Sequence, residues 1–151
     1  MADFIIKKFG ELSPHLLYRI LKLRQDVFII EQNCIYDDID GVDPNCDHLC
    51  LLENKELIGY ARLVPADNLF TDPSIGRIIV PADKRGHGYG RMVIREALSI
   101  LHSRGAKNIV IEAQNHLRNY YESEGFIAEG EIYDVDGIPH IKMWQKRSQS
   151  W

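Results

Sequence analysis

The sequence predicts a single α/β domain, covering residues 1–151, built around one mixed β-sheet. Its 151 residues suit one domain, and a content of 45% hydrophobic and 26% charged residues is ordinary for a globular chain with its own core. The predicted elements run strand, helix, two strands, strand, helix, strand, helix, two strands, an order typical of helices packed on a sheet. No run of 18 apolar residues occurs, so no membrane partner is expected.

The N-terminal part of the chain predicts a strand followed by a long helix. The apolar run at 4–6 indicates the strand. Ser13 is a good helix cap, and Pro14 suits the first helical position. Apolar residues then recur at helical spacing, so the helix is expected to run from 14 to about 31, in one piece or two.

The middle of the chain predicts three strands. Residues 48–53 and 56–63 form a predicted hairpin that turns at Asn54-Lys55. A loop is expected at 66–74. The apolar run at 75–80 predicts a strand that ends at Pro81.

The C-terminal half alternates between helices and strands. Residues 91–104 carry a helical apolar pattern, and 108–111 form a continuous apolar run that predicts a buried strand. A short helix is expected at 116–124. The stretches 126–133 and 138–144 predict a final hairpin.

Charge and cysteine content narrow the class of function. The formal net charge of −4 makes a nucleic-acid partner unexpected. The three cysteines form no CxxC pair, and the N-terminus lacks the pattern of an export signal, so a cytoplasmic location is expected. Residues 25–54 contain acids but no Lys or Arg, which is compatible with either a solvated loop or a face that attracts a cation.

A glycine-rich segment at 80–91 lies between a predicted strand and a predicted helix. Glycines let successive backbone N–H groups face one point, and the helix that follows adds its positive end. The segment therefore predicts a phosphate or diphosphate site, to which Arg85 and Arg91 could add charged contacts. The chain contains no GxxxxGK followed by Ser or Thr, which excludes a Walker loop. It also lacks a dinucleotide fingerprint, because the third glycine position of that motif is Arg91.

Two motifs together resemble the GNAT acetyltransferase superfamily. Arg85, Gly88 and Gly90 match its Arg-x-x-Gly-x-Gly loop, and about 30 residues later Tyr121 begins a Tyr-x-x-x-Gly-Phe match. Taken alone, the glycine motif could be a tight turn between a strand and a helix. The tyrosine motif alone could be a helix whose aromatic residue packs in the core. Further stretches at 28–36, 40–43, 113–114, 116–117 and 136–140 are similar to bacterial ElaA-like proteins.

The resemblance implies a fold and a cosubstrate. The implied fold is a mixed, mostly antiparallel sheet of about seven strands, flanked by about four helices and splayed at its central strands. The implied cosubstrate is acetyl-CoA, with no metal. The residues implied to contact it are Ile78, Ile79, Val80, Arg85, Gly86, His87, Gly88, Tyr89, Gly90, Arg91, Gln114 and Asn119.

The resemblance also implies direct attack of an amine on the thioester. Backbone N–H groups of 78–80 would stabilise the oxyanion, and Tyr121 would protonate the departing thiolate. The attacking amine must first lose a proton, and the sequence leaves four candidate bases open. These candidates are Glu31, Asp40, His48 and His140.

A small cationic amine is the expected acceptor, and Glu31 and His140 are the catalytic candidates beside Tyr121. The residues expected to bind the acceptor are Glu31, Gln32, Tyr36, Asp40 and His48. A protein or peptide acceptor, or a sensor that binds acetyl-CoA without turnover, is the alternative. Cys46, His48 and Cys50 alternate along one strand, a spacing that argues against a metal site. The sequence decides neither for nor against a homodimer.

Overall fold

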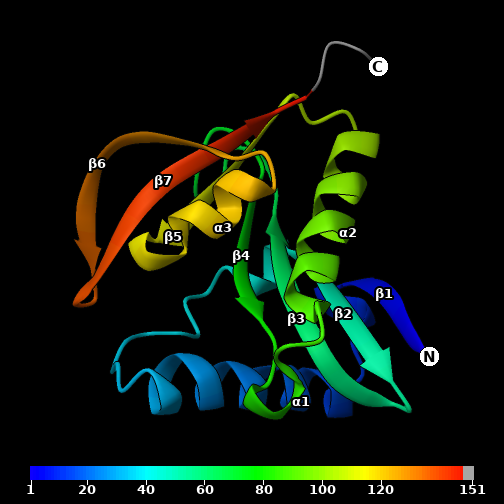
Figure 1. Cartoon of the computed structure of the whole chain (residues 1–151). Coiled ribbons are helices and arrows are strands. Elements are labelled where there is room, and N and C mark those ends of the chain that lie inside the picture. Colours follow the sequence, from blue (N-terminus) through cyan, green and yellow to red (C-terminus); the bar gives the residue numbers. More distant parts are fainter. Residues whose placement is uncertain (148–151) are drawn as a thin grey trace.

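The computed structural model describes residues 1–147 as one seven-stranded sheet with helices on both faces (Figure 1). The strands are β1 (Ala2–Lys8), β2 (Asp47–Glu53), β3 (Glu56–Val64), β4 (Ser74–Ile79), β5 (Asn108–Gln114), β6 (Ile127–Val135) and β7 (Ile138–Lys146). The helices are α1 (Pro14–Arg24), the π-helix η2 (Gln25–Glu31), α2 (Tyr89–Ser103) and α3 (Arg118–Ser123), with short 3₁₀ turns between elements. The sequence-based strand predictions are confirmed.

The helical segments follow the predicted signals with two differences. Ser13 caps α1 by accepting a hydrogen bond from the Leu16 backbone N–H at 3.1 Å, with Pro14 at the first position. The expected long helix changes from α to π geometry at Gln25. The expected helix at 116–124 starts as a 3₁₀ turn and becomes α3 at Arg118. Three α-helices therefore flank the sheet, and the π-helix continues the first of them.

The sheet has the order β1-β2-β3-β4-β5-β7-β6, and neighbouring strands are antiparallel except β4 and β5. The parallel pair is joined at a single bridge, Ser74 with Val110, near the start of β4. Beyond it, within the described chain, no further bridge joins the two strands. The sheet is therefore splayed at its centre, and β4 diverges from β5 in Figure 1.

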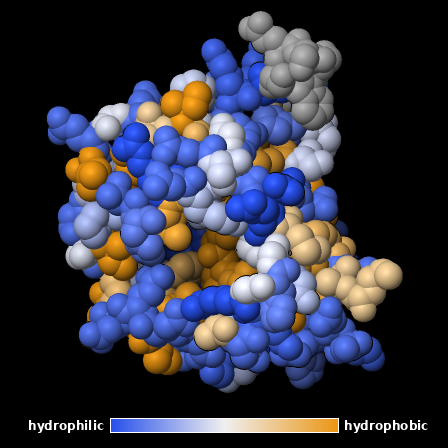
Figure 2. All heavy atoms as spheres, viewed as in Figure 1, coloured by the Kyte–Doolittle hydropathy of each residue, from blue (hydrophilic) through white to orange (hydrophobic). Residues whose placement is uncertain are grey.

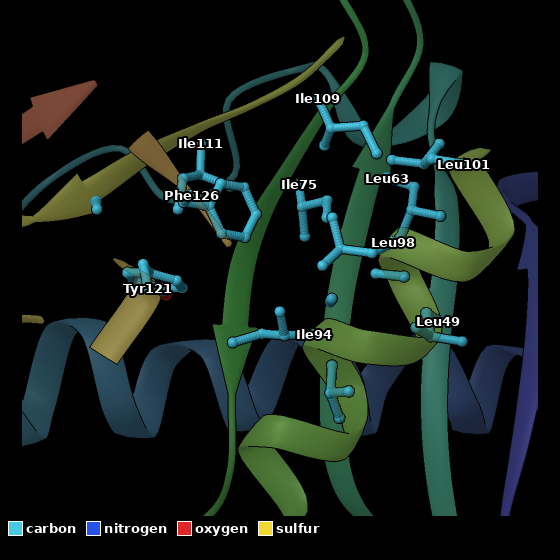
Figure 3. Close-up of a cluster of buried hydrophobic side chains, with 14 of the residues drawn as sticks. Leu49, Leu63, Ile75, Ile94, Leu98, Leu101, Ile109, Ile111, Tyr121 and Phe126 are labelled. Atoms are coloured by element: carbon cyan, nitrogen blue, oxygen red, sulfur yellow. The ribbon is translucent and has the colours of Figure 1, made fainter. Parts of the chain in front are cut away.

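Two apolar clusters hold the two faces together. On one face, Ile94 and Leu98 of α2 pack against Leu63 and Ile75 of the sheet (Figure 3). On the other face, a smaller cluster buries Ile20 and Leu23 of α1, together with Val27 of η2, against the strands. Because successive strand side chains alternate in direction, β2 contributes Leu49 to the first cluster and Cys50 to the second. The opened centre of the sheet is therefore covered by helices from both sides.

A β-bulge interrupts β4 within the stretch that borders this opening. Between the bridges Tyr60–Ile79 and Arg62–Gly76, two residues of β4 lie opposite one residue of β3. One of the two, Arg77, has φ +52°, the left-handed conformation that is costly for a residue with a side chain, by about 1 kcal/mol or more. The bulge is therefore a local distortion that other contacts must sustain.

Candidate functional site

A cavity of about 450 Å³ opens where β4 and β5 separate. Val27 and Phe28 of η2 line it from one face of the sheet, and Leu117 and Tyr121 line it from the other. Figure 2 shows a hollow with an apolar floor in this region, bordered by hydrophilic residues. The cavity thus passes between the two strands rather than lying on one face.

The strand predicted to contact the cosubstrate forms a wall of this cavity. Ile78, Ile79 and Val80 all line it. Because β5 has left this stretch of β4, its backbone groups on that side are free from ladder pairing. They are available to a polar ligand in the cavity.

The glycine loop connects the end of β4 to the start of α2. Gly86 and Gly88 have φ values of +86° and +81°, a conformation that glycine adopts without strain. Nothing lies within 4 Å of the position that a Cβ would take at either residue. Gly88 is also the N-cap of α2, so the open loop leads directly to the positive end of a helix. Backbone N–H groups can therefore hold an anion here.

The two arginines of this loop are paired within the protein. Arg85 forms a two-pronged ion pair with Glu31 at 2.6 and 3.0 Å, and its Nε donates to the Val80 carbonyl at 3.1 Å. Arg91 pairs with Glu124 at 2.8 Å and lies over the Tyr120 ring. Both guanidinium groups are therefore engaged by other groups of the protein. The backbone N–H groups of the loop are the donors that remain for an anion.

The remaining residues predicted around the cosubstrate are distributed unevenly. Gln114 lines the cavity and donates from Nε2 to the Gln32 side-chain oxygen at 3.2 Å. His87 and Tyr89 lie in or just after the glycine loop, with their rings 5.9 Å apart. Gly90 lies in the first turn of α2, where an added Cβ would meet the Tyr120 hydroxyl at 3.6 Å. Asn119 is exposed in the first turn of α3 and lies off the cavity wall.

Tyr121 lies at the cavity wall from the short helix α3. Its ring makes edge contacts with Tyr120 and Phe126 at centroid distances of 5.4 and 5.9 Å, and the pair Tyr121–Phe126 is visible in Figure 3. The side chain is only 8% exposed. An ordinary phenol is already protonated at neutral pH, and burial raises the pKa of Tyr121 further.

Four of the acceptor-side candidates come together at the cavity. Glu31 and Gln32 reach it from the end of η2, where a π-helix often marks a functional position. Tyr36 and His140 complete the group. The Nδ1 atom of His140 lies 2.7 Å from the Ile138 carbonyl, which can only accept. In the neutral ring Nδ1 therefore carries the proton, and Nε2 carries the lone pair.

The acidic segment adopts an arrangement that differs from both sequence-based alternatives. Three of its aspartates are paired with arginines of three other elements, at distances from 2.7 to 3.4 Å. The aspartates are Asp38, Asp40 and Asp43, and the arginines are Arg24 of α1, Arg62 of β3 and Arg77 of β4. We refer to these six residues as the ion-pair cluster. Its acidic charge is neutralised locally rather than presented to a cation.

Asp40 and His48 lie off the cavity wall, contrary to the expectation for acceptor-binding residues. Burial works against a charged Asp40, but hydrogen bonds from Arg62 and the Val42 backbone lower the pKa of Asp40 to about 2. His48 is 1% exposed; its Nε2 lies 3.0 Å from the Asp43 carbonyl, and its Nδ1 lies 2.6 Å from the Tyr60 hydroxyl. Burial lowers the pKa of His48, so the ring is a neutral part of the core.

The cavity wall also includes polar residues that the sequence analysis did not select, among them Glu112 and Arg77. Glu112 accepts a hydrogen bond from the Tyr133 hydroxyl at 2.9 Å, and Arg77 lies at the bulge in β4. A signal for Glu112 was present, because it is two residues from Gln114 on one strand and so shares its face. Arg77 carried no such signal, because its position depends on the bulge.

Two general properties of the described chain bear on partners. Within residues 1–147, no group of three His, Cys, Asp or Glu side chains is arranged to hold a metal ion. No helix in the same range is long and apolar enough to cross a membrane.

Comparisons with known proteins show which sequences and folds this chain is similar to. Residues 23–146 match the family described as acetyltransferase (GNAT) domain. Protein ElaA of Escherichia coli K12 is 43% identical over 137 residues, which cover 89% of this chain and 90% of that protein. The crystal structure of E. coli ElaA superposes with a TM-score of 0.89 and 39% identity, over 97% of this chain and all of the other.

Two further solved structures share the fold. An acyl-CoA N-acyltransferase from Pseudomonas aeruginosa has a TM-score of 0.90 and 33% identity, covering 96% of this chain and 99% of the other. A GNAT family acetyltransferase from Elizabethkingia anophelis, with acetyl-CoA bound, has a TM-score of 0.70. Its identity is 18%, and the match covers 97% of this chain and 98% of the other, so it supports the fold alone.

Proposed function

Since the chain belongs to the GNAT family of acetyltransferases and is ElaA-like, we propose that it moves an acetyl group from acetyl-CoA to an amine by direct attack. The observation that carries this proposal is the cavity between β4 and β5, whose walls include the strand before the glycine loop, Tyr121 and His140. Acetyl-CoA is the proposed cosubstrate because the chain belongs to an acetyltransferase family, and acetyl-CoA is also the molecule bound in the E. anophelis structure of the same fold.

The glycine loop is proposed to hold the diphosphate of acetyl-CoA. The open positions at Gly86 and Gly88 leave room for phosphate oxygens close to the backbone. The helix dipole of α2 favours negative charge at this end. The pantetheine and thioester would then follow β4 into the cavity, where backbone N–H groups of 78–80 stabilise the oxyanion.

Tyr121 is the proposed general acid. When the tetrahedral intermediate collapses, the carbon–sulfur bond breaks and the thiolate needs a proton. A buried phenol with a raised pKa holds its proton at neutral pH and can supply it at that moment. Its position on the cavity wall supports this role.

His140 is the proposed general base, chosen among the four candidates by environment. Glu31 is paired with Arg85, Asp40 has its pKa lowered to about 2, and His48 is enclosed in the core. A cavity-lining imidazole with its lone pair on Nε2 is suited to take a proton from a substrate ammonium.

A small amine is the proposed acceptor. The cavity volume of about 450 Å³ lies in the range of small-molecule sites. The ion-pair cluster neutralises three aspartates of the acidic segment, so the carboxylates that would attract a cationic amine are those on the cavity wall, Glu31, Glu112 and Asp136. A protein N-terminus or a lysine side chain is the second acceptor class to be tested.

The test is release of free thiol from acetyl-CoA, across polyamines, amino sugars, amino acids and peptides. Acetyl-CoA binding is measured in parallel by calorimetry. Thiol release with a small amine and not with peptides supports the proposal. Binding without release for every acceptor would instead identify a sensor, and release with peptides alone would move the acceptor to the protein class.

The base assignment has its own test in His140→Gln. We expect kcat to fall by about 100-fold near neutral pH, because the variant no longer accepts the proton of the ammonium. The deficit should shrink as pH rises toward 10, where the amine loses its proton to solvent. A deficit that stays constant with pH would contradict the assignment.

A further inference from the structure

The bulge in β4 lies between two places where that strand is bridged to β3. Gly76 is bridged to Arg62 before the bulge and Ile79 to Tyr60 after it, whereas the bridge to β5 at Ser74 comes before both. After the bulge, residues 78–80 line the cavity. The direction in which their backbone groups point is therefore set at Arg77, where φ is +52°.

The Arg77 side chain is held by one short segment of the loop that precedes β2. Its Nε donates to Asp38 Oδ1 at 2.8 Å, and its Nη2 donates to the Asp38 carbonyl at 3.2 Å. Its guanidinium carbon lies 5.5 Å from the centre of the Tyr36 ring, a cation–π contact. Its Nη2 also donates to Asp40 Oδ2 at 3.4 Å, so four contacts converge on a single strained residue.

The anchor is itself fixed. Asp38 is 4% exposed and accepts hydrogen bonds from Arg24 Nε at 2.9 Å and from the Tyr36 hydroxyl at 2.7 Å. Arg24 is fully buried at the end of α1. The position of Asp38 is therefore determined by the helix and its own loop, independently of Arg77.

We propose that Arg77 is a positioning residue, clamped by Asp38 and Tyr36 so that the left-handed bulge persists and the backbone of 78–80 faces the thioester. The inference rests on the proposed acetyl transfer, because that reaction gives those backbone groups their purpose. Among the described residues, no bridge to β5 fixes the backbone of 78–80, because the single bridge between the two strands is at Ser74, before the bulge. The bridge of Ile79 to Tyr60 holds this stretch on the β3 side, and the clamp holds the bulge that precedes it, where pairing to β5 is missing.

The test compares substitutions that differ in backbone preference. Arg77→Ala removes the clamp and keeps a Cβ that disfavours positive φ, whereas Arg77→Gly and Arg77→Asn remove the clamp but adopt that φ readily. We expect Arg77→Ala to lower kcat by about 10- to 100-fold, because small displacements of reacting groups have effects of this size. The Gly and Asn variants should recover most of the loss. Acetyl-CoA affinity should change by less than the rate in all three.

Folding is expected to survive in each variant, because Asp38 keeps Arg24 and Tyr36 as partners. Hydrogen exchange of the backbone at 78–80 gives a readout that does not depend on turnover, and faster exchange in Arg77→Ala than in the wild type is expected. If the wild type releases no thiol with any acceptor, the proposed function fails. The role of Arg77 in holding the bulge is then tested by the exchange measurement alone.

Three results would overturn the clamp. Unchanged exchange and rate in Arg77→Ala would show that the bulge sustains itself. Equal loss of rate in the Ala, Gly and Asn variants would show that the side chain matters for another reason. A raised KM for acceptors that carry a carboxylate, relative to the same amines without one, would identify Arg77 as an acceptor-binding residue instead.

Discussion

Tyr121 is buried by its neighbours and still forms part of the cavity wall. Burial raises the pKa of a phenol that is protonated at neutral pH in any case. The edge contacts with Tyr120 and Phe126 fix the ring through its carbon atoms rather than through the hydroxyl. The hydroxyl can therefore be removed with little change in packing.

Replacement of Tyr121 by Phe should separate packing from proton donation. We expect kcat to fall by about 100-fold or more, while acetyl-CoA affinity and thermal stability stay close to those of the wild type. The matched control is Tyr120→Phe, which removes the hydroxyl of a neighbouring tyrosine off the cavity wall and should leave kcat nearly unchanged. An equal rate in the two variants would contradict the assignment of the general acid.

At the scale of elements, the π-helix η2 and the glycine loop meet through the ion pair of Glu31 with Arg85. Both side chains are about 40% exposed, so this pair contributes little to stability. Its importance lies in position, because a carboxylate and the diphosphate of acetyl-CoA would compete for one guanidinium. If acetyl-CoA binds as we propose, the pair opposes its binding.

Glu31→Gln should accordingly tighten acetyl-CoA binding. We expect a decrease of up to about fivefold in Kd, since a like charge is removed and Arg85 is released toward the diphosphate. The gain should diminish at high salt, which calorimetry at two ionic strengths will reveal. The rate of the chemical step should be preserved. A large fall in kcat, with Kd unchanged, would return Glu31 to the role of base.

The glycine loop makes a second prediction at this scale. Gly88→Ala places a Cβ on a residue with φ +81° in the open part of the loop, so acetyl-CoA affinity should fall by about tenfold. Gly105→Ala is the matched control: φ there is +93°, an added Cβ also meets nothing, and the residue follows the far end of α2. Both variants should lose similar stability, but the control should keep its affinity.

The sequence predicted local features of this molecule better than side-chain partners. The strands, the hairpin at Asn54-Lys55 and the helix start at Ser13 follow from residues close in the chain, and the structure confirms them. The pairing of Arg85 with Glu31 joins positions 54 residues apart, which no local pattern encodes. The bulge at Arg77 is likewise set by contacts with a distant loop.

At the scale of the whole molecule, the ion-pair cluster joins α1, the loop before β2 and the central strands. A partial sequence signal existed, since Arg24 falls on the apolar face of its helix with Ile20 and Val27. A charged residue on such a face is expected to be paired. The pairing makes the fold dependent on ionised aspartates, and the buried neutral His48 adds a second dependence on pH.

The free energy of unfolding should therefore fall in two stages as pH decreases. Burial lowers the pKa of His48 in the folded state, so below about pH 6.5 the unfolded chain binds a proton that the folded chain does not. Arg62 and Arg24 lower the pKa values of Asp40 and Asp43 against the effect of burial, so a steeper loss begins below about pH 4 and continues toward pH 2. Urea unfolding at a series of pH values measures both slopes, and each group contributes up to about 1.4 kcal/mol per pH unit. His48→Gln should flatten only the upper stage, and Asp40→Asn only the lower one. A wild-type slope retained by both variants would mean that other groups govern acid unfolding.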